Sequence, residues 1–229
     1  MSRIALARLA LAIDTTAEHG SIALADETGL REEVAIHAPL GFSQVLFGEI
    51  ESLLSRQRIA LKDIDILAGA SGPGSFTGVR VGLAAIKGLA EVLGKRVVAV
   101  SNLAALAAFG KSDLRAVVID ARRGEIYGAV YDSAGNQIVP ESVLPLKTFL
   151  TLLPAADPAS RLEWISEGLA AYAPPGCKIV ETPREIAGAI ARIALHPGTQ
   201  SQWAAQNPAA IEANYVRRSD AELLWKESL

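Results

Sequence analysis

A short pattern occurs twice in the chain, and it restricts the possible folds more than any other feature. Leu11–Asp14 is an apolar stretch that ends in an aspartate, and a polar turn joins it to the alternating stretch Ser21–Asp26. Ala116–Asp120 ends in the same way, and the turn after it leads to the alternating stretch Glu125–Asp132. The two copies are 106 positions apart. This repeat of strand, aspartate, turn and second strand predicts an internal structural duplication.

Strand and helix patterns alternate in the first half of the chain. Ser43 is expected to cap the first helix, and Gly94 is expected to end the second one. The expected order is strands at 9–13, 21–25 and 30–37, a helix at 43–57, a strand at 64–70, a helix at 77–93, a strand at 97–100 and a helix at 101–110. This order is that of one complete α/β unit, so we expect an N-terminal half at 1–110.

The second half, expected at 111–229, has a less regular pattern because six prolines interrupt it between residues 140 and 175. After the repeated unit, strands are expected at 164–168 and 178–180. Thr182–Glu185 has the spacing of a capping box with proline at the first helical position, and it predicts a helix that continues to His196. Residues 198–229 are expected to form a tail.

Composition excludes several kinds of site. A single cysteine, Cys177, forms neither an intrachain disulfide nor a cysteine cluster, and the three histidines have no metal-motif spacing. We therefore expect no metal and no catalytic residue on this chain. The 22 basic and 25 acidic residues indicate a poor stand-alone binder of nucleic acid. Because no run of 18 apolar residues occurs, we expect no membrane span and a cytoplasmic protein.

The turn after the first strand is a candidate nucleotide site. Asp14, Thr15 and Thr16 offer a carboxylate and two hydroxyls, which suit a cation or a phosphate, and Asp120 is the counterpart of Asp14 in the second copy. The alternative is that Asp14 only caps its own turn. The turn has no glycine that would let a phosphate approach the backbone closely.

The glycine-rich segment Gly72–Gly78 has two interpretations. It is not a Walker A loop, because Val79 follows the last glycine where that loop needs lysine. Its amides are candidates for an anion site at the start of a helix. The favoured alternative is close packing, since Gly78 and Gly82 give the helix a thin surface.

The helices at 43–57 and 77–93 carry more apolar surface than one sheet face needs. One interpretation is that all of it is internal core. The other is a subunit interface formed by both helices. The candidate interface residues are Val45, Leu46, Ile50, Leu53, Val79, Leu83 and Ile86.

Four segments together resemble the TsaB family (formerly YeaZ), which takes part in bacterial synthesis of tRNA threonylcarbamoyladenosine. They are Leu11–Thr16, Ser71–Gly82, Ile119–Arg122 and Asn214–Arg217. The second segment is the most specific, and the resemblance covers nearly the whole chain. It implies an α/β fold of the actin/Hsp70-like (ASKHA) class with two RNase-H-like halves. The chain departs from many relatives at Phe42–Gln44 and at Ala70–Gly72.

The resemblance also implies a function, that of a non-catalytic scaffold subunit. Such a subunit pairs with a TsaD-like catalytic subunit through two helices, and with a TsaE-like ATPase, for threonylcarbamoyl transfer to adenosine 37 of tRNA. No cofactor is expected on this subunit, and ATP or ADP within the complex is left open. The tRNA is expected to bind through the complex, with Arg217 and Arg218 as candidate contacts. The alternatives are an autonomous phosphotransferase or peptidase, and a homodimeric binding module.

Overall fold

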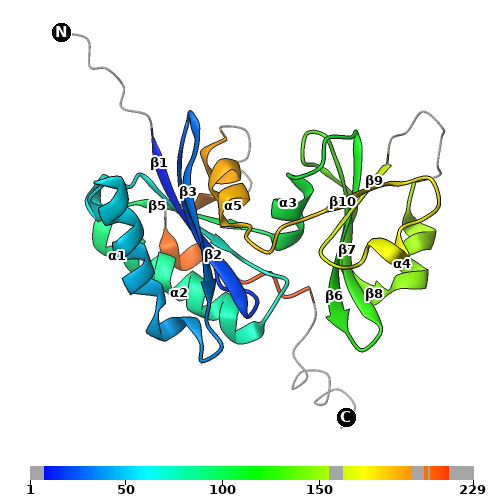
Figure 1. Ribbon diagram of the computed structural model, residues 1–229, viewed down its shortest axis with the longest axis horizontal. Helices are drawn as coiled ribbons and strands as arrows, with labels where there is room; N and C mark the ends of the chain where they lie inside the picture. Colours follow the sequence, from blue (N-terminus) through cyan, green and yellow to red (C-terminus); the bar gives the residue numbers. More distant parts are fainter. Residues whose placement is uncertain (1–7, 155–161, 197–203, 206, 217–229) are drawn as a thin grey trace. The chain divides into compact units, whose positions relative to one another are not determined.

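The computed structural model describes residues 8–154, 162–196, 204–205 and 207–216. It contains two mixed β-sheets (Figure 1). In the first sheet the strand order is β11-β5-β4-β1-β2-β3. Its strands are β1 (Leu9–Asp14), β2 (His19–Asp26), β3 (Gly29–His37), β4 (Ile66–Ala70), β5 (Arg96–Val100) and β11 (Ala204–Ala205). β1, β2 and β3 pair antiparallel, whereas β4 and β5 continue the sheet from β1 in parallel.

The second sheet repeats this arrangement in the order β10-β9-β6-β7-β8. Its strands are β6 (Leu114–Arg122), β7 (Glu125–Asp132), β8 (Gln137–Pro145), β9 (Leu162–Ser166) and β10 (Lys178–Glu181). β6, β7 and β8 pair antiparallel, and β9 and β10 continue from β6 in parallel. The two copies of the sequence pattern therefore occupy equivalent strands, and the predicted duplication is confirmed.

Five α-helices lie in the described residues, namely α1 (Leu46–Gln57), α2 (Phe76–Leu93), α3 (Asn102–Ala107), α4 (Leu146–Leu152) and α5 (Ala187–Leu195). Gly94 ends α2 in the left-handed conformation, as predicted. The predicted cap by Ser43 is wrong. A 3-10 turn, Phe42–Gln44, precedes α1, and no side chain caps the helix. None of the described helices is long and apolar enough to cross a membrane.

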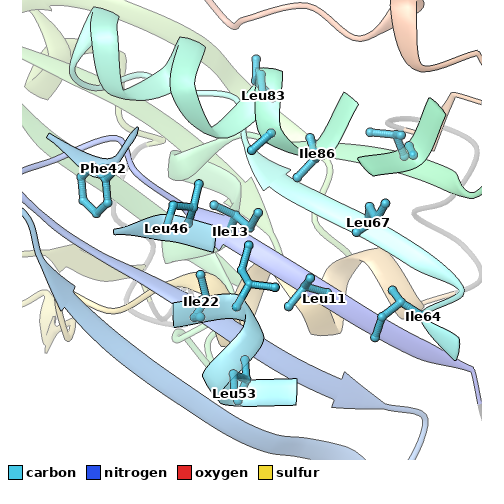
Figure 2. Packing of buried hydrophobic residues seen from close by; sticks show 14 of the residues in the cluster. Leu11, Ile13, Ile22, Phe42, Leu46, Leu53, Ile64, Leu67, Leu83 and Ile86 are labelled. Atoms are coloured by element: carbon cyan, nitrogen blue, oxygen red, sulfur yellow. The ribbon is translucent and has the colours of Figure 1, made fainter. Parts of the chain in front are cut away.

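The two faces of the first sheet carry side chains of different size. β1 and β2 alternate bulky residues with alanine, so the bulky residues all point to one face. That face packs against α1 and α2, where Leu11, Ile13 and Ile22 meet Leu46 and Leu53 from α1, and Leu83 and Ile86 from α2 (Figure 2). α5 packs on the alanine-lined side of β1 and β2 (Figure 1). Small residues on both α5 and the sheet allow this close contact.

The predicted capping box before α5 is wrong. The residue before the helix, Ile186, makes no side-chain cap. The first helical amides instead bond to the first sheet, where Ala187 N donates to Ser21 Oγ (3.0 Å) and Gly188 N donates to Glu33 Oε1 (2.8 Å). A carboxylate at a helix N-terminus also interacts favourably with the helix dipole. These bonds attach α5 to strands that lie more than 150 positions earlier in the chain.

The chain divides into two compact units. The first comprises residues 1–105 and 183–213, and the second comprises residues 106–182 and 214–229, each within the described ranges. The expected halves at 1–110 and 111–229 differ from this division, because α5 and the segment at 207–213 pack with the first unit. In the second unit, α4 packs on one side of the sheet around Phe149 and Trp164.

Candidate functional site

The turn after β1 is closed by bonds within the turn itself. Asp14 ends β1, where its Oδ1 atom accepts hydrogen bonds from Thr16 N (2.9 Å) and Thr16 Oγ1 (2.6 Å). All three residues of the turn, Asp14, Thr15 and Thr16, are buried. A side-chain oxygen that accepts the amide two residues on is an Asx turn, so Asp14 caps its own turn. That was the alternative to the phosphate interpretation, and it describes this geometry.

Helix α2 begins directly against this turn. Thr15 Oγ1 donates to the carbonyl of Gly78 (2.7 Å), and Ser75 N donates to the carbonyl of Thr16 (2.6 Å). A Cβ atom on Gly78 would lie 1.9 Å from the Thr15 carbonyl oxygen, and one on Gly82 would lie 2.6 Å from Thr15 Oγ1. Any side chain at either position would collide with the turn. The close-packing interpretation of these glycines is therefore confirmed.

Asn102 connects the turn to the loop that precedes α2. Its Nδ2 donates to Thr16 Oγ1, and its Oδ1 accepts from Gly72 N (3.0 Å). Its own backbone amide donates to the Gly72 carbonyl (2.8 Å). Asn102 is the first residue of α3 and is buried. A continuous buried network thus joins the end of β1, the loop before α2 and the start of α3. The sequence resemblance did not include Asn102.

Burial makes the Asp14 carboxyl a weaker acid than an aspartate in water. The pKa of Asp14 is raised to about 6, chiefly because the carboxyl is removed from water; the bonds from Thr16 oppose the rise, and the negative charge of Glu33 adds a smaller increase. Glu33 is held on β3 by Ser21 Oγ (3.2 Å) and by Gly188 N. Asp14 therefore lies close to the site where α5 attaches to the sheet.

The candidate nucleotide residues come from both units. Asp14, Thr15 and Thr16 belong to the first unit, and the hydroxyls of Thr15 and Thr16 both donate within the protein. Asp120 belongs to the second unit, where its side chain is 51% exposed and accepts from Arg122 N (2.8 Å). A phosphate at the first turn would have to replace these intrachain bonds, and nucleotide binding there stays a prediction.

The start of α2 likewise uses its amides internally. Ser75 caps the helix, because its Oγ accepts from Gly78 N (3.3 Å) and its carbonyl accepts from Val79 N (2.9 Å). The Arg80 guanidinium lies over the Phe76 ring, 3.7 Å from its centroid. The sequence reasoning proposed the anion site on the glycines alone and did not recognise Ser75 as the N-cap.

The candidate interface residues lie mostly inside the first unit. Six of the seven are at most 5% exposed and belong to its hydrophobic core, namely Leu46, Ile50, Leu53, Val79, Leu83 and Ile86. Val45 is 38% exposed. These six side chains fill the space between the two helices and the sheet, so they have little surface left for a partner. The apolar stripes of the sequence thus mark the inward faces of α1 and α2.

The outward faces of the same helices carry small residues. We define the outer face as Gly48, Ser52 and Ser55 of α1 together with Ala84, Gly88 and Val92 of α2, all of which are exposed. Val92 is 85% exposed, and Phe47, next to Gly48, is 56% exposed. A Cβ atom on Gly48 or Gly88 would meet nothing within 4 Å. Sequence reasoning missed this face, although glycines inside two helix patterns were visible.

The other titratable candidates form no additional site. His19 and His37 stack with ring centroids 4.4 Å apart, and His37 Nε2 lies 3.0 Å from Glu18 Oε1. In the part of the chain that the structure describes, no group of three or more His, Cys, Asp or Glu side chains could hold a metal ion. Arg217 and Arg218 lie outside the described residues. The segment before them is tied to the second unit, where Asn214 Nδ2 donates to Glu141.

Comparisons with known proteins connect this architecture to one family. The family profile described as "TsaD: tRNA N6-adenosine threonylcarbamoyltransferase" matches residues 37–187. The "tRNA threonylcarbamoyladenosine biosynthesis protein TsaB" of Bacillus subtilis (strain 168) is 30% identical over 230 residues, which cover 95% of this chain and 98% of that protein. The protein of the same name from Escherichia coli (strain K12) is 36% identical over 132 residues, 56% of this chain and 57% of that protein.

Solved structures give the same result. A Pseudomonas aeruginosa structure described as an uncharacterized protein with similarity to peptidase YEAZ is 28% identical, with a TM-score of 0.72, and covers 92% of this chain and 100% of that chain. "YeaZ from Pseudomonas aeruginosa" is 29% identical, with a TM-score of 0.67, and covers 82% of this chain and 92% of that chain. The predicted class of fold, actin/Hsp70-like with two α/β halves, is confirmed.

Proposed function

The chain belongs to the TsaB family of tRNA threonylcarbamoyladenosine biosynthesis proteins, and we propose that it serves as a non-catalytic subunit that docks a TsaD-like transferase through the outer face of α1 and α2. The transferase subunit supplies the chemistry of threonylcarbamoyl transfer to adenosine 37. This chain supplies a rigid surface that holds the transferase.

One observation carries the docking proposal, namely two exposed glycines in the helices, Gly88 in the interior of α2 and Gly48 in the first turn of α1. A glycine in a helix interior costs roughly 1 kcal/mol relative to alanine. Gly78 and Gly82 have an internal reason for that cost, because they contact the turn after β1, but Gly48 and Gly88 face open space. A second helix that packs closely across the outer face would supply the reason, since glycine lets two backbones approach. The exposed Val92 and Phe47 would add apolar area to such a contact.

The remaining assembly follows from the same role. A TsaE-like ATPase is the proposed third component, and the tRNA is proposed to bind mainly through the partner subunits, because this chain has a net charge of −3. Any ATP or ADP is proposed to bind elsewhere in the complex. The engaged hydroxyls of Thr15 and Thr16 support this proposal and argue against an autonomous phosphotransferase.

The test uses variants on the outer face that leave the core intact. Gly88→Leu adds a bulky side chain where the isolated chain has room for it, and Val92→Arg adds a charge at an exposed position. Both are expected to keep the fold, measured by circular dichroism and thermal melting, and to lose co-elution with the TsaD-like subunit of the same organism. Ile138→Arg, on an exposed position of β8, is the matched control and should co-elute normally, while Gly88→Ala adds only a methyl group and should weaken co-elution less than Gly88→Leu does.

Two outcomes would contradict the proposal. Normal co-elution of both Gly88→Leu and Val92→Arg would exclude the outer face as the docking surface. A homodimer that persists in the presence of the TsaD-like subunit, measured by light scattering, would favour a homodimeric binding module. Leu46→Arg is unsuitable for this test, because Leu46 is buried and the variant should unfold the first unit.

A further inference from the structure

We propose that Thr16 and Asn102 are positioning residues, whose hydrogen bonds hold the N-terminal end of α2 at the angle that the docking partner requires. This inference rests on the proposed function, because it assigns a task to residues behind the docking helix. It also gives the turn after β1 a role other than nucleotide binding.

The Thr16 hydroxyl lies at the centre of the buried network. Thr16 Oγ1 donates to Asp14 Oδ1 and accepts from Asn102 Nδ2, so one atom links the end of β1 to the start of α3. The Thr16 carbonyl accepts from Ser75 N, the cap residue of α2. Loss of the hydroxyl would leave a buried amide donor on Asn102 and a buried carboxylate oxygen of Asp14 with fewer partners.

Asn102 holds the loop that precedes α2. Its side chain and its backbone both bond to Gly72, three residues before the cap Ser75. The loop is therefore fixed from two sides, by the turn after β1 and by α3. The conformation of this loop sets the position of Phe76, the first residue of α2. A small rotation of the helix about Phe76 would displace Val92, sixteen residues further along, more than it displaces the first turn.

Close packing of α2 on the turn after β1 restricts how the helix can move. A Cβ atom on Gly74 would lie 2.6 Å from the Thr16 carbonyl oxygen, and Gly78 contacts Thr15 even more closely. The helix is in backbone contact with the turn over its first turns, so a shift of the turn is passed directly to the helix. Hydrogen-bonded polar groups in such a contact define a single arrangement more strictly than apolar packing does.

The experiment removes the hydroxyl and keeps the shape. Thr16→Val deletes the bonds of Oγ1, and Thr16→Ser keeps them. Asn102→Ala breaks the link from the other side and serves if Thr16→Val does not fold. Isothermal titration with the TsaD-like subunit gives the stoichiometry and the Kd separately. We expect Thr16→Val and Asn102→Ala to bind with unchanged stoichiometry and a Kd raised about tenfold, about 1.4 kcal/mol, while Thr16→Ser stays within about twofold of the wild type.

A control separates positioning from general stability. Val130→Ala creates a cavity in the core of the second unit and should lower the melting temperature about as much as Thr16→Val does. Its Kd should equal that of the wild type. Wild-type affinity in Thr16→Val and Asn102→Ala, or an equal loss in Val130→Ala, would overturn the positioning role. Absence of binding by the wild-type chain would instead overturn the proposed function.

A second measurement addresses nucleotide binding at the same turn. The melting temperature of the isolated chain is recorded with and without Mg-ATP for the wild type, Thr16→Val and Thr16→Ser. We expect no increase that depends on the Thr16 hydroxyl, because that hydroxyl already donates to Asp14. An increase seen in the wild type and Thr16→Ser but lost in Thr16→Val would make Thr16 a phosphate ligand and would overturn the proposal.

Discussion

The two repeated units end their first strands in aspartates with different surroundings. Asp14 is 2% exposed, and the glycine-rich start of α2 packs directly on the turn that follows it. Asp120 ends the equivalent stretch of β6, but its side chain is 51% exposed, and a tight hairpin follows it. The same sequence pattern therefore forms a buried junction in the first unit and an exposed turn in the second.

The second aspartate of each repeat, in contrast, has the same task in both units. Asp26 accepts from Thr28 N and Thr28 Oγ1, and Asp132 accepts from Ala134 N and Asn136 N. The Thr28 and Asn136 bonds, respectively, are the largest cause of the lowered pKa of each carboxyl. These bonds stay within four residues. The two units thus share the hydrogen bonds that are local in sequence. They differ at the first aspartate, where segments distant in sequence supply the contacts in the first unit only.

The largest expected difference between the units comes from a methyl group placed on the buried junction. Gly78→Ala puts a Cβ atom 1.9 Å from the Thr15 carbonyl, so the helix or the turn must move, and we expect a loss of about 3 kcal/mol in the free energy of unfolding. Gly124→Ala, in the hairpin of the second unit, meets no atom within 4 Å and has only the strain of its positive φ of 78°, about 1 kcal/mol. Urea denaturation measures both.

Gly88→Ala is the internal control for that pair. It removes a helix glycine that faces open space, so it should stabilise the isolated chain by up to about 1 kcal/mol. If Gly78→Ala lowered the free energy of unfolding no more than Gly124→Ala does, the buried junction would accommodate a methyl group. The two turns would then not differ in packing as proposed.

The sequence predicted most strands of both units, β8 and β11 excepted, because their signals are local. Alternation of Leu or Ile with alanine defines β1 and β2, and the repeat predicts β6 and β7. It also predicted the helix that ends before His196, but not how α5 begins, because the groups that accept its first amides, Ser21 and Glu33, lie far away in the chain. The alanines on one side of β1 and β2 were a signal that a small-residue helix packs there.

The candidate site was predicted less completely, for a related reason. Asp14 and the glycines of α2 were recognised from their types, but the bond from Asn102 to Thr16 joins residues 86 positions apart. No spacing rule reveals such a contact. The inward stripes of α1 and α2 were proposed as an interface because periodicity identifies an apolar face without showing what covers it. The exposed glycines Gly48 and Gly88, and not the apolar stripes, distinguish the proposed docking face from the core.

Because Asp14 is buried, the free energy of unfolding should fall as the pH rises. Its pKa rises from the ordinary value of 3.8 to about 6, so the folded state holds the proton more tightly than the unfolded state does. The stability contributed by the protonated carboxyl is fully present below about pH 4 and is lost as the pH rises through 6. Asp14→Asn is neutral throughout and keeps an oxygen for Thr16. It should match the wild type at pH 4 and exceed its stability by about 2 kcal/mol at pH 7.

Asp120→Asn is the matched variant in the second unit. Its side chain is half exposed, so the free energy of unfolding, measured by urea denaturation at pH 4 and at pH 7, should change by less than about 0.5 kcal/mol at each pH. Equal pH profiles for Asp14→Asn and the wild type would mean that Asp14 is ionised in the fold at little cost, which would contradict the prediction.

The smallest expected effect lies in the hairpin of the second unit. Arg122 pairs with Glu125, so Arg123 and Gly124 form a two-residue turn, and both have positive φ, 56° and 78°. This is the geometry for which Asn-Gly is preferred, because asparagine adopts the left-handed conformation more easily than arginine does.

Arg123→Asn should therefore stabilise the protein by about 0.5 kcal/mol and raise the melting temperature by about 2 °C. Arg123→Ala removes the same side chain without easing the backbone, so it should bring no increase. A lower melting temperature for Arg123→Asn would show that contacts of the arginine side chain outweigh the strain of its backbone. The first turn contains no positive-φ residue among the described positions, so this route to stabilisation belongs to the exposed turn alone.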